Sequence, residues 1–307
     1  MNQSNKTIKN LAGLFSQVQA QPITKKLVVA AAHDEHILDA VFMAWEQNII
    51  EPILVGNKKI ITEITKEKNY SLKNVEIIDV KDKTEAAIEA VKIINRGEGD
   101  ILIKGNVDSS IFLRPVLNRE YGLRVGETLS HLGIIELPHY HKIFALTDGA
   151  LNIAPDLDLK RIILKNSIHF MRKLGIPKPK IAALGALELV HPKMQATIDA
   201  ALLSKMAQRG QIKDCIIEGP LSFDNAISKK SAELKGLNSE VAGEADILLA
   251  PNIEAANVLY KSIVYFAGAN PACIILGASV PIILTSRSDS EKIKLNSITL
   301  AASVNLR

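Results

Sequence analysis

Short apolar runs alternate with longer amphipathic stretches along most of the chain. Runs such as Leu27–Ala32 and Pro52–Gly56 are typical of strands buried on both faces. The stretch 34–47 between these two runs carries apolar residues at helical spacing. Strands separated by helices predict right-handed parallel crossovers, and therefore an α/β fold. By the same pattern we expect strands at 75–80, 100–105, 180–185, 214–218, 246–250, 273–276 and 281–284, and helices at 87–94, 109–118, 158–173, 193–209, 224–233 and 253–266.

One segment in the middle of the chain departs from this alternation. The apolar runs Leu132–Glu136 and Lys142–Thr147 leave no room for a helix between them, which favours an antiparallel hairpin. The length of 307 residues exceeds the usual size of one domain. We therefore expect two three-layer α/β domains with a cleft between them. The first comprises residues 1–127 and 278–307 and is discontinuous, and the second comprises residues 128–277 with the inserted hairpin.

Composition narrows the function classes. Apolar residues make up 47% and charged residues 23% of the chain, which is ordinary for a globular enzyme. The net charge of +4 is spread along the chain without basic arms, so we expect anionic small molecules rather than nucleic acid. No apolar run approaches the roughly 18 residues of a membrane span. Cys215 and Cys273 lie in apolar runs without paired metal-ligand spacing, which indicates buried, reduced thiols and a cytoplasmic protein.

The stretch from Ile282 to Glu291 carries the clearest chemical signal. It begins as an apolar strand and continues into Ser286 and Arg287, a hydroxyl donor and a planar guanidinium suited to phosphate. Ser288 and Glu291 fit a capping box, so we expect the last helix to start there. A strand end that meets a helix N-terminus favours an anion. An ordinary capped helix with a surface arginine is the alternative.

Polar residues and glycines also follow the other predicted strands, where ligands of open parallel sheets bind. Asp224 lies in a polar turn that leads into a helix, and Asn257 and Lys261 share one face of a helix. For each of these positions, turn residues and helix caps are the structural alternative. The candidates of this kind are Lys104, Asn106, Arg114, Asp148, Asp224, Asn252, Asn257, Lys261 and Gly277.

Several well-known site signatures are absent from the sequence. There is no G-x-x-x-x-G-K-[ST] loop, and Gly97-Glu98-Gly99 precedes a strand rather than opening a helix, which argues against nucleotide-binding folds. No G-x-S-x-G elbow indicates a serine hydrolase. The histidine pairs His33/His36 and His139/His141 lie outside any H-E-x-x-H frame. We therefore expect no metal site.

The longest motifs resemble those of the phosphotransacylases, most closely the phosphate butyryltransferase branch. The resemblance runs from about Leu27 to Val304. It implies two α/β domains related to the isocitrate and isopropylmalate dehydrogenases, and reversible transfer of a short-chain acyl group between coenzyme A and phosphate. It implies no bound cofactor, because the coenzyme A thioester is a substrate, and it implies a homo-oligomer. The motifs are IKGNVDSSIFLRPVLNREYGLR, TDGALNIAPDLDLK, EGPLSFDNAIS, VAGEADILLAPNIEAANVLYKS and PIILTSRSDS.

The resemblance also implies residue roles. Ser286 would stabilise the transition state, and Arg287 would hold the phosphate or acyl phosphate. Lys104 and Arg114 are further anion-binding candidates. An aspartate shortly after the Ser-Arg pair serves as base in the family, so Asp289 is expected in that role, with Glu291 as the alternative. The remaining candidates, expected to bind substrate, are Asn106, Asp148, Asn152, Asp224, Asn252, Asn257, Lys261 and Gly277.

Three other functions compete with this hypothesis. A phosphate acetyltransferase would use the same chemistry with a smaller acyl pocket. A dehydrogenase on the related fold would need a cluster of metal-binding aspartates and a nicotinamide site, which the sequence does not arrange. A non-catalytic acyl-coenzyme A binding protein would tolerate the loss of Ser286 and Arg287. Phosphate-dependent release of thiol from a panel of acyl-coenzyme A thioesters distinguishes the two transferases by their acyl preference, and absence of release indicates a binding protein or a different reaction.

Overall fold

The structure is a computed structural model that describes residues 8–286 and 289–306. It divides into two compact units. The first unit contains residues 11–126 and 272–306, and the second contains residues 8–10 and 127–271. The sequence predicted divisions after residues 127 and 277. The later junction lies earlier in the structure because strand β10 (Asn270–Leu276) pairs with β11 (Ile282–Ile283) of the first unit.

The sheet of the first unit is mostly parallel. β1 pairs in parallel with β2 on one side and β4 on the other, and β11 continues the parallel series beside β4. Only β10 runs antiparallel there, with Ile275 opposite Ile282. The predicted strands are confirmed, although the last one is shorter than expected. The strand order is β3 (Glu76–Asp79), β2 (Ile50–Gly56), β1 (Lys25–Ala30), β4 (Ile101–Lys104), β11 and β10.

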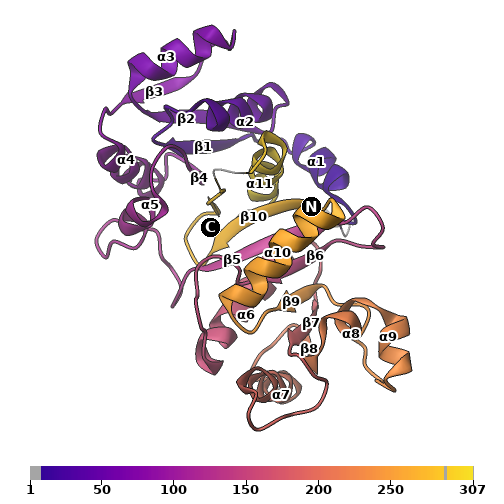
Figure 1. Ribbon diagram of the computed structural model, residues 1–307. Coiled ribbons are helices and arrows are strands. Elements are labelled where there is room, and N and C mark those ends of the chain that lie inside the picture. The colour runs from indigo at the N-terminus through magenta and orange to yellow at the C-terminus, as the bar shows by residue number, and fades with distance from the viewer. Residues whose placement is uncertain (1–7, 287–288, 307) are drawn as a thin grey trace. The chain divides into compact units, whose positions relative to one another are not determined.

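Helices cover both faces of this sheet (Figure 1). Helices α1 (Leu11–Gln19), α2 (Glu35–Glu46) and α11 (Glu291–Ser303) pack together, and α4 (Lys83–Asn95) packs with α5 (Ser109–Val116). Right-handed crossovers explain the two layers, because the chain moves from β1 to β2 in one direction and from β3 to β4 in the other. The sequence did not predict α1, nor α3 (Lys58–Glu67), in which only Ile61 and Thr65 are buried.

The second unit contains the predicted hairpin. β5 (Ser130–Glu136) and β6 (Phe144–Thr147) pair antiparallel, with Gly133 opposite Leu146 and Ile135 opposite Phe144. The remaining strands run parallel to β6. The hairpin prediction is therefore confirmed. The strand order is β5, β6, β9 (Ile247–Leu249), β7 (Lys180–Leu184) and β8 (Ile216–Leu221).

Two helix layers cover this second sheet as well (Figure 1). Helices α6 (Leu157–Lys173) and α7 (Gln195–Gln208) pack together. Helices α8 (Phe223–Ile227), α9 (Lys229–Leu234) and α10 (Ile253–Ala267) contribute to a buried apolar cluster with β6, β7 and β9. The sequence predicted one helix over 224–233. Ser228 divides it, because its extended backbone ends α8 while its side chain accepts the Ser231 N–H that begins α9.

The predicted start of the last helix is wrong. Ser290, not Ser288, is the N-cap of α11, and its Oγ accepts a hydrogen bond from the Ile293 N–H at 3.3 Å. Glu291 is therefore the first helical residue, too early for the second position of a capping box. Its carboxylate instead contacts His36 Nδ1 at 3.4 Å. Ser288 lies outside the described residues.

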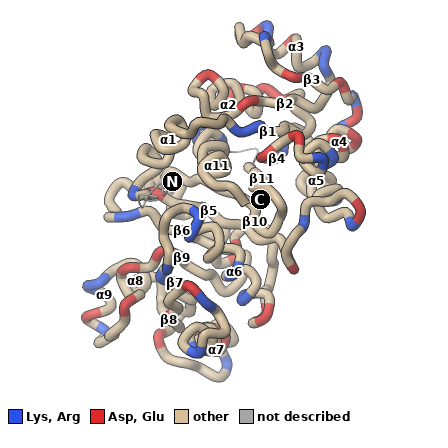
Figure 2. The backbone as a smooth tube through the Cα atoms, turned by 180° about the vertical axis from the view of Figure 1, so that it is seen from behind, with Lys and Arg blue, Asp and Glu red and all other residues tan. Residues whose placement is uncertain are grey.

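Positively and negatively charged side chains are interspersed along the chain rather than clustered by sign. Helices α3, α7 and α9 each carry residues of both signs (Figure 2). In the described part of the chain, no helix combines the length and apolar character needed to cross a membrane. Cys273 is buried in β10, and Cys215 is buried just before β8. Burial, followed by the nearby charge of Asp214, raises the pKa of Cys215 to about 11, so this thiol stays protonated at neutral pH.

A buried ion pair joins two helices of the second unit and provides a test of its packing. Lys160 of α6 is 5% exposed and Asp199 of α7 is 3% exposed, and their Nζ and Oδ2 atoms are 2.6 Å apart. Gln195 Nε2 donates to the second carboxylate oxygen at 2.8 Å. Lys160→Met should lower the free energy of unfolding by about 3–5 kcal/mol, because Asp199 would remain buried without its cation.

Chemical denaturation of the full chain measures this change. The matched control is Lys165→Met, which removes an exposed ammonium from the same helix and should change stability by less than about 0.5 kcal/mol. Equal effects of the two substitutions would contradict a stabilising role for the Lys160–Asp199 pair.

Candidate active site

The carboxyl ends of β1, β4 and β11 lie side by side in the first unit. Ala30 of β1 pairs with Lys104 of β4, and Ile103 of β4 pairs with Ile283 of β11. Because all three strands are parallel, the residues that follow them reach the same edge of the sheet. This register brings Ser286, from the C-terminal part of the chain, next to Lys104.

A close backbone approach explains the glycine after β4. The Gly105 N–H donates to the Ala30 carbonyl at 2.8 Å, and the Asn106 N–H donates to the Ala31 carbonyl at 2.9 Å. A Cβ atom on Gly105 would lie 2.4 Å from the Ala31 oxygen and 2.7 Å from the Ala30 oxygen, closer than any side chain tolerates. Only glycine lets this loop rest on the end of β1 and hold Asn106 at the edge.

A cavity of about 490 Å³ opens at this edge of the first unit. The volume is within the usual range for small-ligand sites. Asp34, His36 and Ile37 line one part of the wall. The carboxylate of Asp34 caps α2 by accepting the Ile37 N–H at 3.0 Å. The other lining residues are rich in cations and hydrogen-bond donors, namely Lys83, Lys104, Gly105, Asn106, Thr285, Ser286 and Lys294.

Ser286 and Asp289 form a tight turn beside the cavity. The Ser286 N–H donates to Asp289 Oδ2 at 2.7 Å, and the Asp289 N–H donates to the Ser286 carbonyl at 3.2 Å. The carboxylate expected to act as base therefore also stabilises the turn that presents Ser286. Ser286 itself is exposed and lines the cavity. Arg287, the predicted phosphate ligand, lies outside the described residues.

Two other candidates from the first unit do not line this cavity. Arg114 lies in the last turn of α5 and is exposed. Gly277 follows β10, which runs antiparallel to β11. It therefore lies at the other ends of the strands from Ser286. Its carbonyl accepts the N–H groups of Val125 and Gly126, and its φ of 90° requires a glycine. This backbone conformation is by itself a sufficient reason for a glycine at position 277.

Asp148 and its neighbours form a buried polar cluster in the second unit. Asp148 is 3% exposed, and its carboxylate accepts the N–H groups of His131, Ala150 and Leu151, each at 3.0 Å. Asn152 Nδ2 donates to Asp148 Oδ2 at 2.6 Å. These bonds stabilise the loop after β6 and account for the burial of the charge. The structure thus brings Asp148 and Asn152 together, and their hydrogen bonds stabilise the loop after β6.

Helix α10 supplies three further candidates of the second unit. Asn252 is its N-cap, and its Oδ1 accepts the Ala255 N–H at 2.9 Å. Asn257 Nδ2 donates to the Gly149 carbonyl at 3.2 Å, which joins the helix to the loop after β6. The Lys261 ammonium lies over the Tyr260 ring, 5.6 Å from its centroid. The Asn252 cap is the structural alternative that the sequence had left open.

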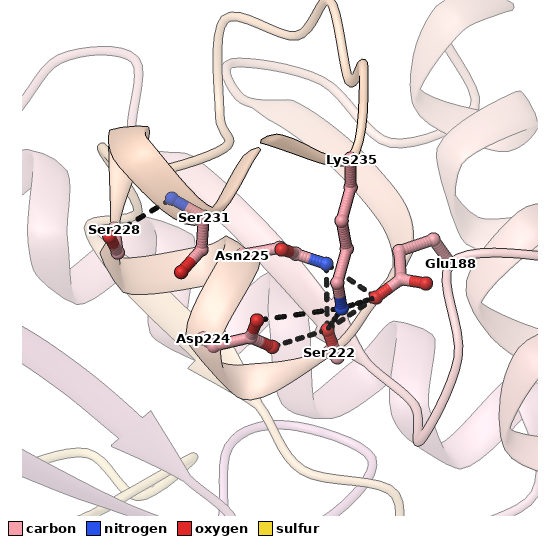
Figure 3. A network of polar contacts seen from close by, with 7 residues as sticks. All are labelled: Glu188, Ser222, Asp224, Asn225, Ser228, Ser231 and Lys235. Carbon is pink, nitrogen blue, oxygen red and sulfur yellow. Dashed lines mark hydrogen bonds and ion pairs between the residues drawn. The ribbon is translucent and has the colours of Figure 1, made fainter. Parts of the chain in front are cut away.

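Asp224 belongs to a polar network at the start of α8 (Figure 3). Ser222 Oγ lies 2.6 Å from carboxylate oxygens of both Asp224 and Glu188. The Lys235 ammonium lies 2.5 Å from Glu188 Oε1 and 3.4 Å from Asp224 Oδ2. Asn225 is fully buried and its Nδ2 donates to Glu188 Oε1. The network joins the loop after β7 to the one after α9.

The sequence of the whole chain matches one family. Residues 12–89 and 83–302 match the profile of the Phosphate acetyl/butaryl transferase family. The chain belongs to this family. It is 47% identical to a phosphate butyryltransferase of Clostridium beijerinckii over 97% of its own length and 99% of the relative's. It is 44% identical to a phosphate acetyltransferase of Thermotoga maritima, over 91% of this chain and 94% of that protein.

A solved structure agrees with the family and with the α/β class predicted from the sequence. The crystal structure of a branched-chain phosphotransacylase from Enterococcus faecalis V583 superposes with a TM-score of 0.82. The two chains are 32% identical, and the match covers 91% of this chain and 98% of the other. The predicted resemblance to the phosphotransacylases is confirmed.

The structure adds two lysines of this transferase that the sequence interpretation missed. Lys83 is the first residue of α4, and Lys294 lies in α11 shortly after the Ser286 turn. Both line the cavity with Lys104, which is 7% exposed and donates to the Val107 carbonyl at 3.1 Å. Neither position carried a motif. Lys294 is a charged residue among apolar residues at helical spacing, and this unusual placement was the available signal in the sequence for a functional lysine.

One group of side chains in the described residues has a spacing compatible with a metal ion. Ligand atoms of His36, Asp39 and Glu291 lie within 4.8 Å of one another. The Lys68 ammonium pairs with Asp39 at 3.2 Å and with Glu35 at 2.5 Å, so a cation already neutralises part of this exposed group. The group therefore needs no metal to account for it.

The Glu188 network predicts a pH-dependent contribution to stability. Hydrogen bonds from Lys235 and then from Ser222 lower the pKa of Glu188 from its usual 4.5 to about 2. A carboxylate with a lowered folded-state pKa stabilises the fold above its unfolded-state pKa, and this contribution disappears as pH falls from about 4.5 toward 2. Glu188→Gln should therefore lower the free energy of unfolding at pH 7, and the difference from wild type should shrink toward pH 3.

Urea denaturation at several pH values measures this difference. Glu233→Gln, which neutralises an exposed carboxylate on neighbouring α9, is the matched control and should give a small difference at every pH. A Glu188→Gln effect that stays constant between pH 7 and pH 3 would contradict the role assigned to its charge.

Two substitutions at Asp289 separate its structural role in the Ser286 turn from its expected role as a base. Asp289→Ala removes the acceptor of the Ser286 N–H and should lower kcat by about tenfold or more, because the turn loses a charge-assisted hydrogen bond. Asp289→Asn keeps a carbonyl acceptor. It should retain most activity if the carboxylate only stabilises the turn, and should lose as much as the alanine variant if the carboxylate also takes a proton. Steady-state kinetics across pH separates these outcomes. Wild-type kcat in both variants would remove Asp289 from the site.

Proposed function

We propose that this chain reversibly transfers a butyryl or branched short-chain acyl group between coenzyme A and phosphate. The full-length similarity to a phosphate butyryltransferase, at 47% identity, carries the proposal. The likeness to a branched-chain phosphotransacylase at 32% identity supports the same acyl class. The cationic cavity beside Ser286 supports it independently, because both phosphate and acyl phosphate are anions.

The chemistry follows from the residues at the cavity. In the direction of acyl-coenzyme A synthesis, the thiol of coenzyme A loses its proton to a base, and its sulfur attacks the carbonyl carbon of the acyl phosphate. A C–S bond forms, the C–O bond to phosphate breaks, and phosphate leaves with the bonding pair. A free thiol titrates near pH 8–9, so a carboxylate base assists the attack. We assign the base role to Asp289 and phosphate binding to Arg287.

Ser286 has the position and chemistry of an electrostatic stabiliser. The attack leaves negative charge on the carbonyl oxygen, and a preorganised hydroxyl donor stabilises it. The Ser286 turn is held by hydrogen bonds in both directions with Asp289, which limits the reorganisation of this donor. Lys104 reaches the same cavity from β4 and stabilises the departing phosphate.

A covalent acyl-cysteine route has no support in this site. The Cys215 thiol has a pKa raised to about 11 and is buried, and Cys273 is buried in the middle of β10. A buried, protonated thiol is a poor nucleophile. We therefore propose direct transfer of the acyl group between the two substrates.

Phosphate acetyltransferase activity is the second candidate. The 44% identity to the Thermotoga maritima phosphate acetyltransferase favours it, since the two relatives differ little in similarity to this chain. The chemistry is the same, and only the size of the acyl pocket differs. One methylene changes discrimination by about 1–3 kcal/mol, so the preference is a matter of degree.

We further propose that the enzyme is a cytoplasmic homo-oligomer. The two buried cysteines, neither of which forms a disulfide, support a reducing compartment. Helix α10 supports self-association, because Val258, Tyr265 and Phe266 are 65%, 67% and 92% exposed. Large apolar side chains that are exposed together on one helix usually mark a surface that another protein covers.

Thiol release from a panel of acyl-coenzyme A thioesters, acetyl through isovaleryl, tests the function. Phosphate-dependent release should be fastest with four- and five-carbon acyl groups. Fastest release with acetyl would assign the second candidate. Absence of release from a folded sample with any thioester would refute both transferase functions and favour a non-catalytic binding protein.

Ser286→Ala should lower kcat in this assay by about 10²–10³-fold, the usual loss when one oxyanion donor is removed. Ser290→Ala is the matched control, because it removes the neighbouring hydroxyl that caps α11 and should cost stability but little turnover. Equal turnover in the two variants would exclude Ser286 from the reaction.

A further inference from the structure

Lys294 is a buried cation that forms no ion pair within 4.0 Å in the described part of the chain, although its charge helps to lower the pKa of Glu291, one turn earlier in α11. It is 5% exposed and lines the cavity beside Ser286. Its ammonium donates to the backbone carbonyl of Asp289. A carbonyl satisfies one of the three N–H groups but does not neutralise the charge. Burying an ammonium without a direct ion pair is costly, so an anion in contact with it would be favourable.

A second buried lysine shows how this chain satisfies such a charge internally. Lys160 is also 5% exposed, and Asp199 lies 2.6 Å away with no cavity between them. Lys294 differs because it borders an open space of about 490 Å³. The comparison indicates that a ligand in the cavity can make the direct contact with Lys294 that Asp199 makes with Lys160.

The other charged groups around the cavity favour an anionic ligand as well. Lys83 and Lys104 are cations, and His36 already contacts the Glu291 carboxylate at 3.4 Å. Asp34 is the carboxylate of the lining, and it is engaged as the N-cap of α2. The lining therefore contains three lysines and one carboxylate, and the Glu291 carboxylate lies close enough to interact with Lys294. Such an excess of positive charge raises the local concentration of anions.

We infer that Lys294, together with Lys83, binds a phosphate group of the substrates. The inference rests on the proposed function, in which that group is either the reacting phosphate or the 3′-phosphate of coenzyme A. Lys294 also acts on the reaction through the chain. Its ammonium donates to the carbonyl of Asp289, whose carboxylate accepts the Ser286 N–H, so the same side chain contacts the ligand and positions the catalytic turn.

Binding of inorganic phosphate alone is the first measurement, because it needs no turnover. Phosphate should bind wild-type protein in calorimetry and raise its melting temperature. Lys294→Met should weaken phosphate binding by about 10- to 100-fold, the usual effect of losing a hydrogen bond to a charged group, and Lys294→Arg should restore much of it. The matched control is Lys292→Met, which removes an exposed ammonium from the same helical turn and should leave binding unchanged.

Kinetics adds a readout that a purely structural role would not change. Lys294→Met should raise the KM for phosphate more than it lowers kcat. Lys83→Met provides a second variant should the first fail to fold, because Lys83 is exposed and its loss leaves no buried cavity; it should raise the same KM several-fold. Comparison of coenzyme A with 3′-dephospho-coenzyme A identifies the source of the phosphate. If the lysine variants bind coenzyme A more weakly than wild type but bind 3′-dephospho-coenzyme A equally well, the lysines bind the 3′-phosphate. If the variants bind inorganic phosphate more weakly, the lysines bind the reacting phosphate.

The inference fails if folded Lys294→Met and Lys83→Met bind phosphate and coenzyme A as tightly as Lys292→Met does. That failure leaves the proposed function intact, provided that wild-type protein releases thiol from acyl-coenzyme A. Conversely, lysine-dependent phosphate binding without any thiol release would support the anion site while refuting the transferase.

Discussion

The parallel pairing of β11 with β4 is the constraint on which the candidate site depends. β11 is short, with Ile283 opposite Ile103, yet this pairing places the end of the chain's last strand beside strands from its first third. Ser286 and Lys294 reach the cavity only because this strand enters the sheet at that position. The close contact of Gly105 with the end of β1 completes the edge. A shift of β11 by one residue would turn its side chains to the opposite faces and separate the Ser286 turn from Lys104.

The cavity is distinguished from the rest of the molecule by how its buried charges are satisfied. Elsewhere, buried charges have partners within the fold, as Asp148 has in three backbone N–H groups and Lys160 has in Asp199. At the cavity, three lysines line the wall with the single carboxylate of Asp34, and Lys294 has no ion pair within 4.0 Å in the described part of the chain. Desolvated charges are expensive unless compensated, so such an imbalance is tolerated where a ligand supplies the opposite charge.

Most of the fold could be predicted from the sequence, and the errors have identifiable causes. Buried strands and the β5–β6 hairpin were predicted because their apolar runs are continuous and their spacing excludes a helix. Helix α3 was missed because it buries only Ile61 and Thr65, which leaves a weak periodic signal. The start of α11 was misplaced because Ser288 and Ser290 are both plausible caps, and hydrogen-bond geometry rather than spacing decides between them. The position of Gly277 at the other ends of the strands from Ser286 could not be predicted, because the direction of β10 is not encoded locally.

The sequence by itself determined the alternation of strands and helices and the membership of the family, and it indicated the Ser286 segment as a candidate site, since each depends on residues that are contiguous in the chain. Only the tertiary structure decided which polar residues share a cavity. Strand order and direction bring Lys83, Lys104 and Lys294 to one edge, and they place Gly277 at the other. The physical reason is that the counter-charge and burial of a lysine depend on neighbours distant in sequence. No local pattern distinguishes Lys294, which borders the cavity, from Lys160, which forms a direct ion pair with Asp199.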